Sequence, residues 1–534
     1  MKYTEEQLRA LDQETVIKLL LSQQDEFEKL DKKMQLLLEQ VAVLNNKRFG
    51  RSSEKLECEN QIAFMEVDGK IVFFNEAEAV ASLDEEGEDE EVTVRKKGKK
   101  RKGKRDEDLS GLPIEVVSHK MTEEELQEEF GDDPYYRLDD EVYRRYKFTP
   151  AKVEVEEHHV EVYASKKTDH IVKAKHPKYL LRNSLVSPSL EAAIINGKYV
   201  NAVPLYRMEK EFERYGLAIT RQNMAHWTIQ CAEKYLAVFY DYLHKLLYEF
   251  HVIHADETPV LVNKDGRPAG AKSYMWVYRT GFLYKDKVIV LYEYQKTRNA
   301  SHPRQFLKDF EGVCITDGYE VYHTLEREKE DLRIAGCWAY SRRRYDEAYK
   351  ALPKGTRRKS LAYFALKQIQ AIYREEAQLK DLSPEERFRR RQLTVKPLVD
   401  AHFEWVRENK DKVLPKGKTS NGFNYTLNQE KYLRVFLEDG EVTMDNNSAE
   451  QSIRGFCIGK KNWVMIDTIR GADASAIIYS IAETAKANNL KPYEYFKYLL
   501  EEISQHMDEK NLSFCEKLLP WSPDLPAECR KQKK

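Results

Sequence analysis

The first sixty residues carry a heptad pattern of apolar side chains. Apolar residues recur at alternating steps of three and four, with Gln23 as the polar interruption, at Val16, Leu20, Phe27, Leu30, Met34, Leu37, Val41 and Leu44. About four heptads predict a coiled-coil helix, although the pattern also fits a helix packed on its own domain. Because no adjacent segment offers a partner face, we expect a homodimer or higher oligomer through residues 16–44. Gly50 is a suitable helix terminator.

Residues 186–250 show a helical pattern with a turn in its middle. Leu205 to Phe212 form an apolar-periodic helix, residues 215–219 predict a turn, and Thr220 can cap a second helix that begins at Arg221. This is the shape of a helix-turn-helix DNA reader, with Arg221 as a DNA-binding candidate. It is equally the shape of any αα-hairpin, so the spacing alone leaves both interpretations open.

The next region is rich in β-branched and aromatic residues. It predicts strands at 251–256, 272–280 and 287–294, a short helix at 304–310, and further strands at 312–316 and 333–337. Three antiparallel strands, a helix and then parallel strands is the opening order of a ribonuclease-H-like fold. The fold class expected for the whole chain is therefore multidomain α+β with a ribonuclease-H-like α/β core.

A helical, highly charged insertion interrupts this order. Basic clusters lie at 342–344, 357–359 and 389–391, and glycine, lysine and asparagine in 415–424 predict a loop. Helical patterning returns through residues 472–489 and 492–504. The boundaries predicted from these patterns are 251–340 and 441–505 for the two parts of the core, 341–440 for the insertion and 506–534 for a C-terminal tail.

Two charged runs separate the N-terminal helix, 1–60, from the rest of the chain. Residues 84–91 are almost wholly acidic, and residues 95–105 hold nine basic residues and two glycines. Neither run can bury a core, so 61–107 is predicted to be a linker. The basic run suits contact with DNA phosphates, and it equally suits a solvated linker. Residues 108–185 predict a small α+β module, in which 152–163 alternate as a strand does.

Composition narrows the class of protein. Charged residues make up 33% of the 534 residues, yet the net charge is −2, so the overall charge says little about partners. The seven cysteines are scattered without a CxxC pair, which favours a reducing compartment and argues against a cysteine zinc site. No signal peptide and no run of about 18 apolar residues is present. We expect a cytoplasmic protein with no membrane partner.

Three acidic residues follow the predicted elements in a pattern that suits metal binding. Asp256 follows the first strand, Asp317 follows the fourth, and Glu450 begins a helix. Carboxyl ends of neighbouring strands converge, and three carboxylates can hold two Mg²⁺ ions, with Asp256 shared between them. Such a pair can clamp the attacking and leaving oxygens of a phosphodiester, and Mn²⁺ is expected to substitute. In a chain with 90 acidic residues, strand-end aspartates are also ordinary turn residues, so spacing alone does not establish the site.

Short motifs carry a more specific signal. They lie at residues 49–55, Pro204–Arg207, His254–Pro259, Cys337–Ala339, Asp445–Glu450, Lys460–Trp463 and Glu483–Lys486. With these motifs the chain resembles the insertion-sequence-66 transposase family. The resemblance covers roughly residues 45–500, and the motifs follow the family's order. The resemblance implies a DDE-type transposase of a bacterial insertion sequence, with a ribonuclease-H-like core, a helical insertion and catalytic, metal-binding residues at Asp256, Asp317 and Glu450.

The same resemblance implies the substrate and the partners. The enzyme is expected to bind terminal inverted repeats, hydrolyse phosphodiesters and transfer 3′-OH ends to target DNA, with accessory proteins of the same element and a nucleoid location when bound to DNA. Candidate DNA contacts beyond Arg221 lie in the insertion and after the glutamate, at Arg342, Arg343, Arg454, Lys460 and Lys461.

Three departures from the family pattern change the expectation locally. Residues 108–185 lack the cysteines of the family's zinc module, so no structural zinc is predicted. Tyr340 stands where the family often has histidine, and Gln451 stands where it often has arginine. A catalytically silent DNA-binding regulator, or domesticated transposase, is the alternative function, and a stand-alone nuclease is a third. The intact acidic triad favours the active enzyme.

Overall fold

The structure is a computed structural model that describes residues 179–531, except Ala269, Lys354 and Lys510. Before residue 179 it describes 64–67, 70–73, 122–133, 152–164 and 171–175, and six further residues: Thr15, Lys18, Leu21, Ser22, Gln24 and Val116. Apart from Lys18, Leu21, Ser22 and Gln24, the predicted coiled coil over 16–44 therefore lies outside the described residues, and so does most of the predicted linker over 61–107.

The described N-terminal elements are short. They are the antiparallel strands β1 (Phe64–Val67) and β2 (Lys70–Phe73), helix α5 (Glu123–Phe130), and the antiparallel strands β3 (Val162–Ala164) and β4 (Ile171–Lys173). The strand predicted over 152–163 is wrong in extent, because regular pairing begins only at Val162. The alternating apolar side chains before it bury no face: Val155 is 95% exposed.

A helical region follows and comprises α6 (Pro188–Ile195), the π-helical η2 (Asn196–Val200), α7 (Leu205–Arg214), α8 (Arg221–Cys231), the π-helical η3 (Ala232–Leu236) and α9 (Ala237–Leu247). The predicted helix, turn and helix are confirmed at α7 and α8. Gly216 has φ +81°, which a glycine adopts without strain, and it ends α7. The Thr220 hydroxyl accepts a hydrogen bond from the Asn223 amide at 3.2 Å and caps α8 as predicted.

The central sheet is mixed. Its elements are β5 (Val252–Lys264), β6 (Lys272–Thr280), β7 (Val290–Gln295), α10 (Ser301–Phe306), β8 (Gly312–Thr316), α11 (Glu320–Glu328) and β9 (Leu332–Gly336). The strand order is β7-β6-β5-β8-β9, with β5, β6 and β7 antiparallel and β8 and β9 parallel to β5. The predicted order of three antiparallel strands, a helix and two parallel strands is confirmed.

The insertion is helical, as predicted. It contains α12 (Trp338–Ala351), η4 (Arg357–Lys359), α13 (Leu361–Gln378), α14 (Pro384–Arg390), η5 (Arg391–Val395), α15 (Lys396–Asn409), η6 (Lys410–Lys412), α16 (Lys418–Asn428), α17 (Glu430–Leu433) and η7 (Val435–Leu437). The loop predicted over 415–424 is wrong, because α16 begins at Lys418. Gly422 lets α16 approach α12: a Cβ there would lie 2.7 Å from the ring of Tyr345. Tertiary packing thus outweighs the weak helix propensity of glycine and asparagine.

The chain then returns to the sheet through α18 (Asn447–Trp463), β10 (Ile466–Thr468), α19 (Ile469–Ala487) and α20 (Pro492–His506), and ends with η8 (Leu512–Phe514), α21 (Cys515–Leu518) and η9 (Ala527–Cys529). Strand β10 pairs in parallel with the far end of β5. The segment predicted as a tail, 506–534, contributes Phe514, Leu518 and Leu525 to the main hydrophobic core. Among the described helices, none is long and apolar enough to cross a bilayer.

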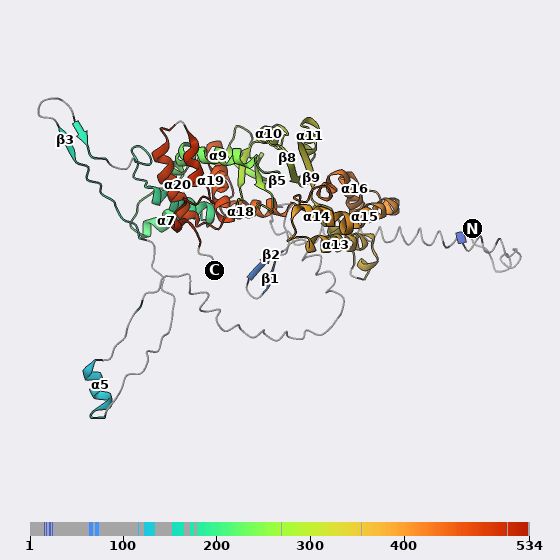
Figure 1. Cartoon of the computed structure of the whole chain (residues 1–534), viewed down its shortest axis with the longest axis horizontal. Helices are drawn as coiled ribbons and strands as arrows, with labels where there is room; N and C mark the ends of the chain where they lie inside the picture. Colours follow the sequence, from blue (N-terminus) through green and yellow to red (C-terminus); the bar gives the residue numbers. More distant parts are fainter. Residues whose placement is uncertain are drawn as a thin grey trace.

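Two hydrophobic cores lie on opposite faces of the sheet. Side chains alternate along a strand, so Ile253 and Ala255 of β5 enter one core while Val252 enters the other. The first core joins the sheet to α9, α19 and α20, and the second joins it to the insertion. In Figure 1 the sheet accordingly stands between α9 and α19 on one side and the insertion helices α13 to α16 on the other. The described chain is thus mixed α+β.

Candidate active site

Asp256 lies inside a strand, at the point where pairing with a neighbour stops. Strand β5 pairs in parallel with β8 only from Val252 to His254, although it continues against β6 to Leu261. The prediction that the strand ends at Asp256 is therefore wrong, and it is the pairing with β8 that ends there. The Thr258–Asn263 run (TPVLVN) is rich in β-branched and apolar residues and prolongs β5 until β10 pairs at Val262.

Asp317 occupies the matching position on the neighbouring strand. The last paired residues of β5 and β8 are His254 and Ile315, and both aspartates lie two residues further on. Asp317 directly follows β8, and its carboxylate accepts a hydrogen bond from the Tyr319 amide at 2.9 Å. Gly318 has φ +87° and allows the sharp turn there. Parallel pairing thus brings the two predicted aspartates together.

A third carboxylate, Glu257, completes a compact cluster that sequence reasoning missed. Ligand oxygens of Asp256, Glu257 and Asp317 all lie within 4.8 Å of one another. Adjacent residues of a strand face opposite ways, so period-two alternation does not predict that Glu257 and Asp256 contribute to the same site. Its position next to Asp256 in the His254–Pro259 motif was the available signal.

The cluster is electrostatically strained without cations. Burial raises the pKa of Asp256 well above its usual value, and the charges of Glu257, Asp317 and Glu450 raise it further. Burial and Asp317 likewise raise the pKa of Glu257 to about 7. One oxygen of Asp256 accepts a hydrogen bond from the Glu257 amide at 2.8 Å, while Oδ2 is buried without a hydrogen-bond partner. A bound cation would relieve both the repulsion and the unsatisfied oxygen.

Glu450 approaches the cluster from helix α18. It lies in the first turn, as predicted, is 4% exposed, and accepts a hydrogen bond from Arg343 at 3.3 Å. It is not part of the group held within 4.8 Å, but its charge raises the pKa of Asp256. Asn446, which precedes α18, holds the start of the helix against β5 through His254 and Ala255.

Two arginines neutralise part of this negative charge. Arg298, in the loop after β7, donates to Glu257 at 2.6 Å and lies 3.8 Å from an oxygen of Asp317. Its guanidinium stacks on the ring of Tyr319 at 3.7 Å. Arg343 of α12 forms an ion pair with Glu450 at 3.3 Å. The sequence did not predict a role for Arg298, because the loop at 296–300 carries no distinctive spacing.

The donors fit a hard divalent cation. All the converging ligand atoms are carboxylate oxygens, which Mg²⁺ and Mn²⁺ prefer, and Asp256 also has a buried oxygen without a hydrogen-bond partner. Asp256, Asp317 and Glu450 are the residues that would hold such ions, with Glu257 as an additional ligand.

Tyr340 is a further residue of the site. It lies on α12, is 9% exposed, and its ring carries the guanidinium of Arg343 at 4.6 Å. Burial and the charges of Asp256, Glu450 and Asp317 raise its pKa well above the usual value. Arg343, which contacts Glu450 at 3.3 Å, links the ring to the carboxylates. Sequence reasoning noted Tyr340 only as a departure from the family pattern.

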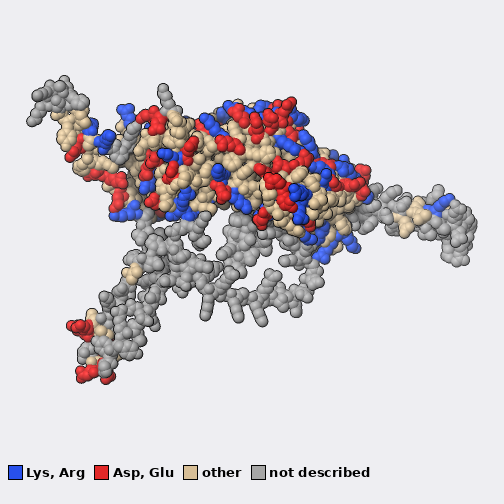
Figure 2. All heavy atoms as spheres, viewed as in Figure 1, with Lys and Arg blue, Asp and Glu red and all other residues tan. Residues whose placement is uncertain are grey.

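The predicted DNA contacts differ in their accessibility. Arg221 and Lys461 are exposed, and Arg221 lies over the ring of Tyr206 at 5.5 Å. Arg342 is buried, and Lys460 donates to the carbonyl of Pro259 on β5. Arg454 is partly buried. On the face shown in Figure 2, basic and acidic side chains lie intermixed over the described core, and no single basic surface stands out there.

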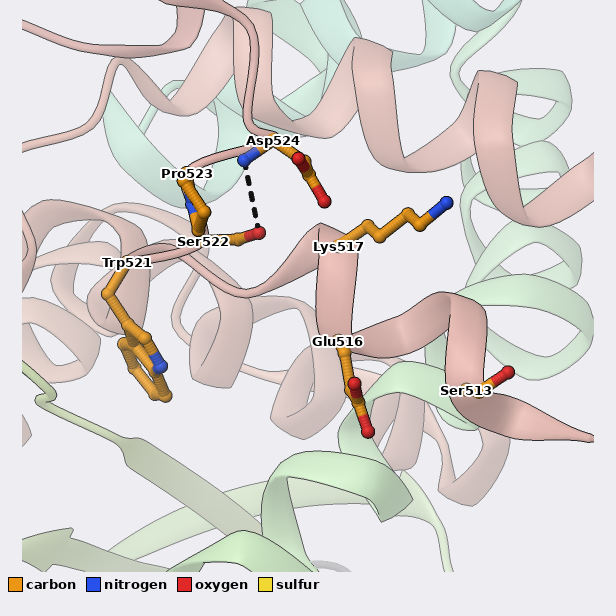
Figure 3. A pocket seen from close by; sticks show the side chains of 7 residues that line it. All are labelled: Ser513, Glu516, Lys517, Trp521, Ser522, Pro523 and Asp524. Carbon is orange, nitrogen blue, oxygen red and sulfur yellow. Dashed lines mark hydrogen bonds between the residues drawn. The ribbon is translucent and has the colours of Figure 1, made fainter.

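A surface hollow lies elsewhere, at the C-terminal elements. It is lined by Ser513, Glu516, Lys517, Trp521, Ser522, Pro523 and Asp524 (Figure 3). The Asp524 amide donates to Ser522 Oγ at 3.3 Å across one side of it. None of the predicted catalytic or DNA-binding residues lines this hollow, which is separate from the carboxylate site.

Comparison with known proteins identifies the class. Residues 183–474 match the model of the transposase IS66 family, residues 480–521 match the IS66 C-terminal element, and residues 36–117 match a model described as the homeodomain of transposase C of IS166. These matches define a transposase, and they support DNA binding. Because the first match alone covers more than half of the chain, the chain belongs to the IS66 transposase family.

The curated relatives are similar over about two thirds of their length. The uncharacterized protein y4qI of Sinorhizobium fredii (strain NBRC 101917 / NGR234) is 28% identical over 67% of this chain and 67% of its own. Protein y4jD of the same strain, also uncharacterized, is 25% identical over 66% of this chain and 69% of its own. A solved structure, the Mos1 transposase paired-end complex with left transposon end, matches 34% of this chain and 66% of that one at 14% identity. Its TM-score is 0.13, which is too low to support a fold assignment.

Proposed function

We propose that this chain is an active DDE-type transposase of an insertion sequence, with a ribonuclease-H-like catalytic core. The strand order β7-β6-β5-β8-β9, with three antiparallel strands followed by two parallel ones, supports this core. The helical insertion lies between β9 and α18, before the glutamate-bearing helix, in the position that the family resemblance implies.

The convergence of Asp256 and Asp317 carries the proposal. Parallel pairing of β5 and β8 puts both carboxylates at equivalent positions, and α18 adds Glu450 to their electrostatic environment. Burying several like charges is costly unless a ligand compensates them. A divalent ion that also binds phosphate oxygens is the ligand that such a cluster favours.

The reaction needs no side-chain nucleophile. Divalent ions, when bound, supply charge stabilisation for the phosphodiester and activate the attacking oxygen. Asp256, Asp317 and Glu450 would hold such ions, and Arg298 and Arg343 would balance part of the remaining negative charge. Hydrolysis breaks the bond between phosphorus and O3′ at the end of the element and leaves a free 3′-OH. That hydroxyl then attacks a target phosphodiester, whose own O3′ leaves, so the two DNA chains become joined.

Other parts of the chain are proposed to bind and pair the DNA ends. The α7–α8 pair, with Arg221 exposed at the start of α8, would contact the terminal inverted repeats. Arg343, Arg454 and Lys461 would contact phosphates near the site. Self-association through residues 16–44 would bring two ends together, with accessory proteins of the element taking part.

A cleavage assay tests the proposal. A supercoiled plasmid carrying the DNA that flanks this coding sequence is incubated with full-length protein and Mg²⁺ or Mn²⁺, and the new 3′ ends are mapped. Wild type should nick at the element ends and Asp256→Asn should not. Asp265→Asn, a control just past the end of β5, should retain nicking. No cleavage by wild type, with salt-dependent binding by wild type and Asp256→Asn alike, would support the regulator instead.

A further inference from the structure

Tyr340 is linked to the carboxylate site through Arg343, which lies over its ring at 4.6 Å and contacts Glu450 at 3.3 Å. Its ring packs in a small buried cluster with Cys337 and Ala339, against the ring of Tyr425. The hydroxyl of Tyr425 in turn donates to the backbone carbonyl of Asp317 at 3.0 Å. Packing through Tyr425 therefore connects the cluster that contains Tyr340 to the turn at Asp317.

The hydroxyl of Tyr340 is buried without a hydrogen-bond partner. Burying an unsatisfied hydroxyl is costly, so most buried tyrosines find an acceptor. On the same helix, the hydroxyl of Tyr345 is hydrogen-bonded to Thr426 at 2.8 Å. Tyr340 lacks such a protein partner. A bound group that brings its own acceptor oxygen would satisfy this hydroxyl.

The charges around the hydroxyl indicate what kind of group this is. The guanidinium of Arg343 lies on the ring at 4.6 Å and contacts Glu450 at 3.3 Å. The guanidinium of Arg343 suits an anion, and the neighbouring carboxylates suit divalent cations. Together they favour an anionic group that binds together with metal ions. A phosphodiester of DNA meets this description, since its non-bridging oxygens accept hydrogen bonds and also bind divalent ions.

We propose that the hydroxyl of Tyr340 donates a hydrogen bond to a non-bridging oxygen of the scissile phosphodiester. This inference rests on the proposed transposase function and adds a catalytic residue to the carboxylates. Histidine, frequent at this position in the family, could donate a similar hydrogen bond. Phenylalanine keeps the ring, its packing and its contact with Arg343, and it removes only the donor.

Phosphorothioate substitution tests this contact. The probe is a duplex carrying the DNA that flanks this coding sequence, with either non-bridging oxygen of the scissile phosphate replaced by sulfur, a weaker acceptor. We expect Tyr340→Phe to slow single-turnover cleavage of the all-oxygen duplex by about tenfold to a hundredfold, as for a hydrogen bond to a charged group. One sulfur isomer should slow wild type, in Mn²⁺ as well as Mg²⁺, but should not slow Tyr340→Phe further. Tyr340→His should recover part of the rate.

Control variants separate this role from a structural one. Tyr345→Phe, on the same helix, should lower stability through its lost hydrogen bond to Thr426, yet keep the wild-type response to both sulfur isomers. If Tyr340→Phe cleaves at the wild-type rate, or if it responds to both isomers as wild type does, the proposed contact is wrong.

A binding measurement distinguishes failure of this contact from failure of the proposed function. The same duplexes are titrated with full-length protein in Ca²⁺, with wild type, Tyr340→Phe and Asp256→Asn. The contact is supported if Tyr340→Phe binds the all-oxygen duplex more weakly than wild type does, but binds one sulfur isomer as well as wild type does. This result would support the contact even if wild type does not cleave and the transposase proposal fails. Equal affinities of wild type and Tyr340→Phe for all three duplexes overturn it.

Discussion

The imidazole Nδ1 of His254 and the carboxamide Oδ1 of Asn446 are hydrogen-bonded at 2.8 Å, and this buried contact joins strand β5 to the start of α18. The carboxamide nitrogen of Asn446 donates to the carbonyl of Ala255 at 2.9 Å, so its oxygen is the acceptor and His254 Nδ1 carries the proton. The Asn446 amide also donates to the sulfur of Cys337 at 3.2 Å. Asn446 thus fixes the helix that carries Glu450 relative to the strand that carries Asp256.

Asn446→Ala should therefore damage the site through position rather than through charge. The buried His254 N–H and Ala255 carbonyl lose their partner, and we expect the free energy of unfolding to fall by about 1–3 kcal/mol. Cleavage should fall more than the fraction of folded protein does, because Glu450 moves with α18. Urea denaturation and plasmid nicking at a temperature where the variant stays folded measure the two effects.

The neighbouring Asn447 supplies the control for that variant. It is partly exposed, and its carboxamide oxygen has no hydrogen-bond partner, so Asn447→Ala should leave both readouts close to wild type. Equal losses of activity in the two variants would show that Asn446 does not position Glu450.

Two aspartates near opposite ends of β5 should respond to substitution with opposite signs. Asp256→Asn removes a buried carboxylate that is repelled by its neighbours, so without metal it should raise the free energy of unfolding by about 0.5–2 kcal/mol. It should also remove the rise in melting temperature that Mg²⁺ or Mn²⁺ gives wild type. Thermal melts with and without ions measure both changes.

Asp265→Asn is the matched opposite case. Hydrogen bonds from the Arg267 side chain, the Arg267 amide and Ser273 lower the pKa of Asp265 to about 2, so its charge stabilises the fold. Its substitution should lower stability and leave the stabilisation by ions intact. If Asp256→Asn also destabilised the metal-free protein, the buried carboxylates would not be under the strain described above.

The parts of the fold that sequence predicted well are those in which local pattern and packing agree. The strands over 272–280 and 312–316 match the observed bounds, because their apolar and β-branched runs are buried in the sheet. Glu450 lies in the first turn of its helix, as its motif implied. The 415–424 segment was mistaken for a loop because its helix depends on a long-range contact, between Gly422 and the ring of Tyr345.

The candidate site was predictable to the extent that it follows from strand order. Asp256 and Asp317 converge because β5 and β8 pair in parallel, which the order of elements already implied. Glu257 and Tyr340 were not predicted, because their roles depend on how side chains of different segments meet. Neither period-two alternation nor residue spacing reports that the ring of Tyr340 on α12 is linked through Arg343 to Glu450 on α18.

Glu191 should make stability depend on pH in the helical region. It is fully buried on α6, accepts a hydrogen bond from Thr228 at 2.8 Å, and has a pKa raised by burial to about 8. The unfolded chain releases this proton near pH 4.5, so the folded state binds one proton more between about pH 4.5 and 8. Stability should therefore fall as pH rises through this window, by up to about 1.4 kcal/mol per pH unit.

Urea denaturation of wild type and Glu191→Gln at several pH values between 5 and 8 isolates this contribution from the other titrating groups. Glutamine keeps the acceptor for Thr228 without ionising, so its variant should gain relative to wild type as pH rises. A constant difference between the two proteins across the series would show that Glu191 does not titrate in this range.

The connection between α18 and β10 holds a strained backbone. Val464 has φ +63° and ψ −52°, and the Met465 amide donates to the carbonyl of Trp463 at 2.7 Å. This is a γ-turn in a conformation that a β-branched residue rarely adopts. The side chain of Val464 is 49% exposed and offers little packing in return. Val464→Gly should therefore raise the free energy of unfolding by about 1 kcal/mol.

Met465→Gly is the control, because Met465 is similarly exposed but does not have a positive φ. It should lower stability, since glycine there only adds conformational freedom to the unfolded chain. Urea denaturation of both variants decides the matter: if they are destabilised alike, the turn at Val464 holds no strain that glycine relieves.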